Sequence, residues 1–267
     1  MALDEAQRPD IHWRVLGQGP RAALALHCNL GHSGAFRGLA AALDDLMTIE
    51  APDMPSHGRS GAFVPGALGG QIMVEAIVDR LKAPVDVIGH SYGGLIAVRL
   101  AIEHPELVRS LSLYEPVTML AARGAAPEEV AKNHAHMSKV LAHYDAGEPE
   151  AAVRLFVEEW GDGRPWAALP EEIRAAFTRQ VPFVVASQRD VLDDIGQIMP
   201  RLGNIAVPVV VMDGALSPAI MTPACDGLAA SLQTARRVTI AGAGHMGAIT
   251  HAAEVAAEVR KIVTDAA

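Results

Sequence analysis

A serine between glycines is the residue of this sequence best suited to chemistry. It lies in the stretch Gly89-His90-Ser91-Tyr92-Gly93-Gly94, which fits the pattern Gly-x-Ser-x-Gly. An apolar run over 85–88 precedes the stretch and a helical pattern over 92–103 follows it. In a sharp strand-to-helix turn, glycines leave room for a strained backbone that exposes the serine hydroxyl. The pattern predicts that Ser91 is a nucleophile at the positive end of a helix, the alternative being a glycine-rich turn without chemistry.

A serine hydroxyl is a weak nucleophile near neutral pH and needs a neighbouring base to take its proton. His245 is the candidate, because it lies in Gly242-Ala243-Gly244-His245-Met246-Gly247, after the last predicted strand. Glycines around it allow the backbone to approach the serine closely. His251 is the local competitor, but six residues further on it should already enter the last helix.

Backbone N–H groups near Ser91 would stabilise negative charge on a reacting oxygen. Tyr92 directly follows the serine, and its amide is the first expected donor. The second is expected from the loop His27-Cys28-Asn29-Leu30-Gly31-His32-Ser33-Gly34, which follows a buried strand. Asn29 is the donor chosen there, through its backbone and with its side chain as a further candidate; a turn with no anion role is the alternative. Cys28 is expected to be an inert, partly buried thiol.

A second turn, 53–61, contains another histidine, His57. Turn-forming residues explain this segment, with Arg59 and Asp53 able to pair, so His57 is not expected to act as the base. Histidines also occur at 134, 136 and 143. His134 and His136 are two residues apart and point to different helical faces, which argues against a metal pair. No metal site and no cofactor are predicted.

Composition excludes several classes of protein. The 267 residues are half hydrophobic and one-fifth charged, as in a compact globular protein, and the net charge of -9 argues against nucleic acid as a partner. No run of eighteen apolar residues suggests a membrane helix, and residues 1–8 lack the apolar core of a signal peptide. Two cysteines, Cys28 and Cys225, cannot form a disulfide framework, which fits a reduced, cytoplasmic location.

Strand and helix patterns alternate along most of the chain. Strands are predicted over 12–16, 22–27, 47–51, 85–88, 110–114, 207–212 and 237–240, and helices over 35–45, 71–81, 92–103, 224–232 and 252–263. This alternation predicts an α/β fold with a mostly parallel sheet covered by helices on both faces.

The segment 117–205 interrupts the alternation. It shows only helical stretches, over 128–144, 150–160, 171–180 and 184–198. A structureless loop of that length would be unusual, so a helical insertion is predicted. Since it begins where the sheet presents its strand ends, it should cover the site as a cap. The expected organisation is a core of 1–116 and 206–267 with a cap of 117–205.

Together these motifs resemble the α/β-hydrolase superfamily, in the branch of serine hydrolases with a helical cap. The resemblance covers nearly the whole chain and rests on the His-x-Asn loop, the Asp-x-Pro-x-His-Gly-Arg-Ser turn, Gly-His-Ser-Tyr-Gly-Gly, the cap and Gly-His-Met-Gly. The chain departs from it at Cys28, where the family usually has glycine. A further antiparallel strand, often present in the family, has little room before Ile11.

The resemblance implies that a carboxylate orients the imidazole of His245. In the commonest family pattern the acid lies three residues past a glycine; here the glycine is Gly214, and three residues on is Ser217, which carries no charge. Capped relatives with an acid after the preceding strand resemble the arrangement at Glu115. Glu115 is therefore preferred, with Asp213 as the alternative acid, unless either carboxylate has only a structural role.

The implied reaction is acyl transfer through an acyl-enzyme on Ser91, with the oxyanion held by the amides of Asn29 and Tyr92. The expected partner is a small-molecule substrate: a small or medium, largely apolar carboxylic ester or lactone. The alternatives are a carbon–carbon bond hydrolase of the meta-cleavage type and a catalytically silent ligand-binding module. Apolar cap residues line a pocket or form the cap's own core; they are Met119, Leu120, Val140, Leu141, Phe156 and Trp160.

Overall fold

Seven strands form one sheet in this computed structural model, which describes residues 8–265. The strands lie in the order β1-β3-β2-β4-β5-β6-β7, and all neighbours are parallel except β1 and β3. Their bounds are β1 Trp13–Leu16, β2 Arg21–Leu26, β3 Met47–Pro52, β4 Val85–His90, β5 Val108–Tyr114, β6 Val209–Gly214 and β7 Ala235–Ile240. The mostly parallel sheet is thus confirmed. Residues 1–7, on which the signal-peptide prediction rests, lie outside the described part of the chain.

The antiparallel strand β1 forms one edge of the sheet. Trp13 pairs with Pro52 and Leu16 with Ile49, so β1 runs against β3. Residues 8–12 contain no strand before it. Within the described residues, the further antiparallel strand often present in similar chains is therefore missing.

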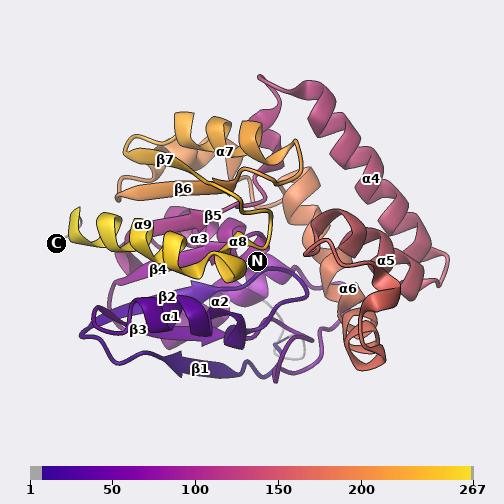
Figure 1. Cartoon of the computed structure of the whole chain (residues 1–267), viewed down its shortest axis with the longest axis horizontal. Coiled ribbons are helices and arrows are strands. Elements are labelled where there is room, and N and C mark those ends of the chain that lie inside the picture. Colours follow the sequence, from indigo (N-terminus) through magenta and orange to yellow (C-terminus); the bar gives the residue numbers. More distant parts are fainter. Residues whose placement is uncertain (1–7, 266–267) are drawn as a thin grey trace.

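Helices cover both faces of the sheet, as predicted (Figure 1). The helices α2 Gly69–Arg80, α3 Tyr92–Glu103 and α7 Met221–Ala230 lie on one face, and α1 Arg37–Ala42, α8 Gly247–Thr250 and α9 Ala252–Asp265 on the other. Successive strand residues point to opposite faces. Val211 accordingly packs in the cluster with α2, α3 and α7, whereas Val210 and Met212 pack in the cluster with α9.

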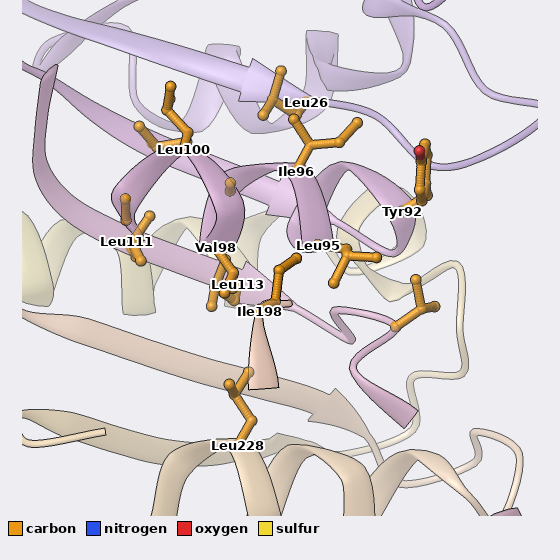
Figure 2. Close-up of a cluster of buried hydrophobic side chains, with 14 of the residues drawn as sticks. Leu26, Tyr92, Leu95, Ile96, Val98, Leu100, Leu111, Leu113, Ile198 and Leu228 are labelled. Atoms are coloured by element: carbon orange, nitrogen blue, oxygen red, sulfur yellow. The ribbon is translucent and has the colours of Figure 1, made fainter. Parts of the chain in front are cut away.

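The helix that follows Ser91 is the centre of one apolar cluster. Figure 2 shows Leu95 and Val98 of α3 near Leu113 of β5 and Ile96 of α3 near Leu26 of β2, all of them almost fully buried. Burying one such side chain stabilises the fold by about 1.5–3 kcal/mol. This packing fixes α3, and with it the turn that carries Ser91, against the sheet.

Three long helices form the insertion between β5 and β6: α4 Pro127–Asp145, α5 Pro149–Trp160 and α6 Glu171–Asp193. They lie together beyond one end of the sheet, on the right in Figure 1. The helical insertion is thus confirmed. The helices share an apolar cluster of their own, formed by Met137, Val140, Ala152, Val153, Val157, Trp166, Leu169 and Val181.

Two predicted helix boundaries are wrong. The separate helices predicted over 171–180 and 184–198 are one helix, α6, which continues through Pro182 and ends at Asp194 in the left-handed conformation. A proline inside a helix costs about 3 kcal/mol, but Phe183 and Val184 beside it are fully buried, and this packing outweighs the cost. The helix predicted over 35–45 is a 3-10 turn followed by α1, which ends at Ala42 because the chain must turn into β3.

Candidate active site

Ser91 occupies a strained turn between β4 and α3. Its φ of 56° and ψ of -121° lie outside the conformations that residues with a side chain prefer. The flanking glycines are required by close packing, because a Cβ on Gly93 would lie 2.2 Å from the carbonyl oxygen of Leu26 and one on Gly89 would lie 2.6 Å from Cα of Gly94. The turn therefore has the geometry expected from the Gly-x-Ser-x-Gly motif.

The structure brings Ser91, His245 and Glu115 together in one hydrogen-bonded chain. The Ser91 Oγ lies 3.0 Å from Nε2 of His245, and Nδ1 of His245 lies 2.6 Å from Oε2 of Glu115. All three side chains are buried. In a neutral imidazole whose Nδ1–H donates to the carboxylate, Nε2 is free to accept the serine proton.

Glu115 is held in place by the end of the next strand. Its Oε1 accepts a hydrogen bond of 2.7 Å from the Gly214 N–H and another from the Ser217 hydroxyl. Glu115 has a φ of 45°, so the backbone turns sharply as it leaves β5. Ser217 thus donates a hydrogen bond to Glu115, at the end of the neighbouring strand. The common pattern has its acid at the position of Ser217 itself.

Asp213, the alternative acid, is engaged elsewhere. Its carboxylate lies 2.6 Å from a guanidinium nitrogen of Arg237 and accepts a hydrogen bond of 2.7 Å from Thr222. Burial by itself would raise the pKa of Asp213, but the hydrogen bonds from Arg237 and Thr222 hold it below its usual value. Of the two carboxylates, only Glu115 is placed against His245 in the described contacts.

The two expected oxyanion donors, Tyr92 and Asn29, both lie close to Ser91. Tyr92 is the first residue of α3, so its N–H is one of the first-turn amides that have no partner within the helix. Asn29 lines the same cavity as Ser91. Its side-chain amide contacts the cap, because Nδ2 donates a hydrogen bond of 2.9 Å to Ser187 Oγ of α6.

Two buried histidines support the Asn29 loop. Nε2 of His57 accepts a hydrogen bond of 3.0 Å from the Leu30 N–H, and Nε2 of His27 accepts one of 2.9 Å from the Met54 N–H. Burial lowers the pKa of His57 to about 3 and that of His27 to about 4, so both rings are neutral. No local motif signals this role, because the partners lie 27 residues apart in both cases.

Asp53 joins the same two segments, though not in the predicted way. Its carboxylate accepts hydrogen bonds from the backbone N–H groups of Ser33, at 2.6 Å, and Arg59, at 2.9 Å. The predicted pairing of Arg59 and Asp53 therefore uses the backbone. Cys28 is buried, and burial raises the pKa of its thiol to about 12, which fits the inert thiol expected there.

The loop that carries His245 is tied to the nucleophile turn. His90 Nε2 donates a hydrogen bond of 2.8 Å to the carbonyl oxygen of His245, and the Tyr114 hydroxyl donates one of 2.7 Å to that of Gly244. The ring of Trp160, from the end of α5, packs edge-on against the imidazole, with centroids 5.0 Å apart. These contacts fix the imidazole between Ser91 and Glu115.

A narrow apolar cavity reaches Ser91. This inner cavity has a volume of about 20 Å³ and is lined mostly by apolar residues, among them Val117, Met119 and Met137. A neighbouring outer cavity of about 160 Å³ shares Phe156 and Trp160 with it and includes Leu30, Leu169 and Phe177. Of the apolar cap residues, Met119, Phe156 and Trp160 thus line the site, whereas Val140 belongs to the cap's own cluster.

The remaining histidines of the insertion do not form a site. His143 pairs with Glu148 at 2.7 Å, and His134 lies 3.4 Å from the hydroxyl of Ser138. Between residues 8 and 265, no group of three or more potential ligands is arranged to hold a metal ion. Over the same residues, no helix has both the length and the apolar character needed to cross a bilayer.

Comparison with known proteins identifies the family. The sequence profile of the alpha/beta hydrolase family matches residues 23–258, so the chain belongs to this family. A thermophilic esterase from Thermogutta terrifontis, solved with malate bound, superposes with a TM-score of 0.74 at 16% identity, over 97% of this chain and 94% of that one. This likeness is one of fold, and it confirms the α/β-hydrolase fold that the motifs predicted.

Curated relatives share part of the sequence. Lipase LipV of Mycobacterium tuberculosis is 32% identical over 160 residues, which are 58% of this chain and 58% of the lipase. A pimeloyl-(acyl-carrier protein) methyl ester esterase of Nitrosomonas europaea is 37% identical over 103 residues, 39% of this chain and 40% of the esterase. The chain thus spans less than two-thirds of the length of either relative.

Proposed function

We propose that this α/β hydrolase is a serine hydrolase that cleaves a small or medium, largely apolar carboxylic ester or lactone. The observation that carries the proposal is the hydrogen-bonded chain of Ser91, His245 and Glu115 at a largely apolar cavity. A serine, a histidine and an acid in this order provide a nucleophile, a base and a group that orients the base.

The reaction begins with attack of Ser91 Oγ on the substrate carbonyl carbon. As the new O–C bond forms, the hydroxyl proton passes to Nε2 of His245 and the carbonyl electrons move onto oxygen. Glu115 stabilises the imidazolium that results. When the tetrahedral adduct collapses, the C–O bond to the alkoxide breaks and the imidazolium gives its proton to the leaving oxygen. In a lactone, this oxygen stays tethered to the acyl group.

Water completes the cycle. His245 takes a proton from a water molecule, which attacks the acyl-enzyme, and the second tetrahedral adduct releases the acid and returns the proton to Ser91. In both adducts, the negative oxygen is bound by the N–H groups of Tyr92 and Asn29. Loss of one such donor typically costs about 3 kcal/mol, a hundredfold or more in rate.

The cavities support a substrate of modest size. The inner cavity holds only about 20 Å³ and the outer one about 160 Å³, with Phe156 and Trp160 at their boundary. The apolar lining of the inner cavity favours an aliphatic or aromatic acyl group over a charged one. The names of the two partial relatives, a lipase and a methyl ester esterase, favour ester chemistry over cleavage of a carbon–carbon bond.

The hypothesis of a silent binding module has less support, because the nucleophile, base and acid are all present and bonded to one another. A fluorophosphonate probe tests it. The wild type should be labelled, Ser91→Ala should not, and Ser231→Ala should label normally, since Ser231 is exposed and bonds only to a carbonyl of its own helix. A folded wild type that resists labelling would favour the binding module. A panel of esters and lactones of increasing acyl length then identifies the substrate class.

A further inference from the structure

Helix α6 presents three buried side chains to the core on a single face. Phe183, Ser187 and Asp190 are 0%, 0% and 5% exposed, and their spacing of four and three residues places them in one row along the helix. We call these three residues the α6 row. Each of them contacts a part of the core that belongs to the site.

Ser187 contacts the first oxyanion donor, Asn29. Its hydroxyl donates to the Val184 carbonyl at 2.7 Å, so it can only accept the hydrogen bond from Asn29 Nδ2. This single contact fixes how the side-chain amide of Asn29 is turned. It also ties the loop after β2 to a helix 158 residues further along the chain.

Asp190 contacts the second donor, Tyr92. The Tyr92 hydroxyl donates a hydrogen bond of 2.6 Å to Oδ2 of Asp190, and the Gly70 N–H at the start of α2 donates another of 3.2 Å. A guanidinium nitrogen of Arg99, on α3, lies 3.9 Å from the other carboxylate oxygen. Figure 2 shows Tyr92 at the start of α3, so the carboxylate holds the residue whose backbone amide follows Ser91.

Phe183, at the start of the row, adds aromatic contacts to the same region. Its ring packs edge-on against Tyr92, at 5.8 Å between centroids, and against His57, at 5.3 Å. His57 in turn accepts the hydrogen bond from the N–H of Leu30, next to Asn29. The phenylalanine therefore touches the supports of both donors.

The contact that Asp190 makes with the core has a free-energy cost. Oδ1 of Asp190 and one guanidinium nitrogen of Arg99 are buried without a hydrogen-bond partner within the described residues. A buried, incompletely paired carboxylate is often less stabilising than apolar packing of the same volume. Its presence beside Tyr92 is better explained by the position that it imposes on that residue.

We propose that the α6 row is a positioning device that holds Asn29 and Tyr92 at the oxyanion-binding distance. Ser187, Asp190 and Phe183 are positioning residues, which act on the reacting oxygen through the two donors. This inference rests on the proposed function and adds that the cap completes the catalytic machinery of the core as well as covering it. The affinity for the transition state should therefore depend on the α6 row more than the affinity for the substrate does.

The test compares a transition-state analogue with a substrate in Ser187→Ala and Asp190→Asn. Butylboronic acid adds to a catalytic serine as a tetrahedral boronate, one of whose oxygens occupies the oxyanion position. Misplacing a donor by about 1 Å can cost up to about 100-fold, so each variant should weaken boronate inhibition and lower kcat by about 10- to 100-fold. KM for a short p-nitrophenyl ester should change by less than about threefold, since that binding precedes the oxyanion.

Thr178→Ala is the matched control. The Thr178 hydroxyl bonds to the Arg174 carbonyl on the same helix at 2.8 Å, as that of Ser187 bonds to Val184, but no hydrogen bond joins it to the core in the described structure. It should leave boronate inhibition and kcat unchanged. Melting temperatures identify variants that lose activity through unfolding, and Ser187→Ala, which removes no charge, carries the test if Asp190→Asn does not fold.

Two results separate the failure of this inference from that of the proposed function. Folded Ser187→Ala and Asp190→Asn that bind the boronate like the wild type would overturn the positioning role, while Ser91→Ala still abolishes turnover. Ester turnover that survives Ser91→Ala would instead overturn the proposed function, whatever the two cap variants do.

Discussion

Two carboxylates stand at the ends of adjacent strands, and only one of them faces the histidine. Glu115 directly follows β5 and Asp213 is the second-to-last residue of β6, and both are 0% exposed. Glu115 bonds to His245 at 2.6 Å, whereas Asp213 bonds to Arg237 at 2.6 Å. The chemical type and burial of the two groups are alike, and their partners differ.

The role of each buried carboxylate therefore depends on the cation that it contacts. Arg237 is permanently charged and already neutralises Asp213, while His245 gains its charge only as it accepts a proton. A carboxylate beside the histidine can therefore stabilise a charge that appears during a reaction. A carboxylate beside the arginine stabilises one that is always present.

The largest difference should appear when each acid loses its charge. Glu115→Gln keeps the shape of the side chain but removes the partner of the imidazolium, and comparable changes in other triads lower kcat by about 10,000-fold. We expect a loss of about 1,000- to 10,000-fold in kcat for a p-nitrophenyl ester, with near-native melting temperature. Asp213→Asn is the paired variant and should lower kcat by less than about tenfold. If Asp213→Asn loses more activity than Glu115→Gln, the acid is Asp213.

Stability should respond in the opposite order. Asp213→Asn takes from Arg237, whose side chain is 20% exposed, its fully buried carboxylate partner and leaves it only the exposed Asp226, at 2.8 Å. Breaking a buried pair from one side typically costs about 3 kcal/mol, so urea unfolding should show a clear loss of stability for Asp213→Asn. Glu115→Gln removes no permanent charge pair and should cost less. Equal losses would mean that the two acids share a structural role.

A pH series separates the carboxylates from the buried histidines. Burial lowers the pKa of His27 to about 4 and those of His57 and His90 to about 3, from 6.5. The unfolded chain then binds more protons, so stability should fall as the pH decreases from about 6.5 toward these values, by about 1.4 kcal/mol per pH unit for each histidine. Urea unfolding between about pH 7.5 and pH 5 measures the slope, and a flat profile would contradict neutral buried rings.

The same series has an internal control. The lowered pKa of Asp213 means that its contribution is complete above the unfolded value of about 3.9 and is lost only at lower pH. The stability difference between the wild type and Asp213→Asn should therefore stay constant from about pH 7.5 to pH 5. A difference that shrinks over this range would show that Asp213 titrates there.

The smallest expected effect comes from Ser217, which connects the two strand ends. Its hydroxyl donates to Glu115, and a hydrogen bond to a charged group contributes about 1.5 kcal/mol. Ser217→Ala should therefore lower kcat by about tenfold through a less well held Glu115. Ser231→Ala, at the exposed residue that follows α7, is the matched serine control. A Ser217→Ala enzyme as active as this control would show that the Gly214 N–H alone suffices to hold the acid.

Local patterns in the sequence predicted the parts of the site that depend on local geometry. The Gly-x-Ser-x-Gly motif sets the turn at Ser91, and the predicted bounds of α3 agree with the structure, because strand, turn and helix follow one another along the chain. The position of Glu115 could also be predicted, because it directly follows a parallel strand. Parallel strands present their carboxyl ends at one edge of a sheet, where His245 also lies.

Contacts between distant segments were beyond these patterns. Asn29 and Ser187 are 158 residues apart, and Tyr92 and Asp190 are 98 apart, so neither pair leaves a periodic signal. Two separate helices were predicted over 171–180 and 184–198, yet the burial of Phe183 keeps α6 continuous through Pro182. In each case the structure depends on tertiary contacts, which local sequence preferences do not reveal.

The formation of an acyl-enzyme tests the central proposal most directly. A p-nitrophenyl ester is mixed with excess enzyme, quenched with acid within the burst, and the mass of the intact protein and of its peptides is measured. We expect a mass increase of one acyl group, located on Ser91, and no increase in Ser91→Ala. Ester turnover without any acyl adduct, or an adduct on another residue, would contradict it.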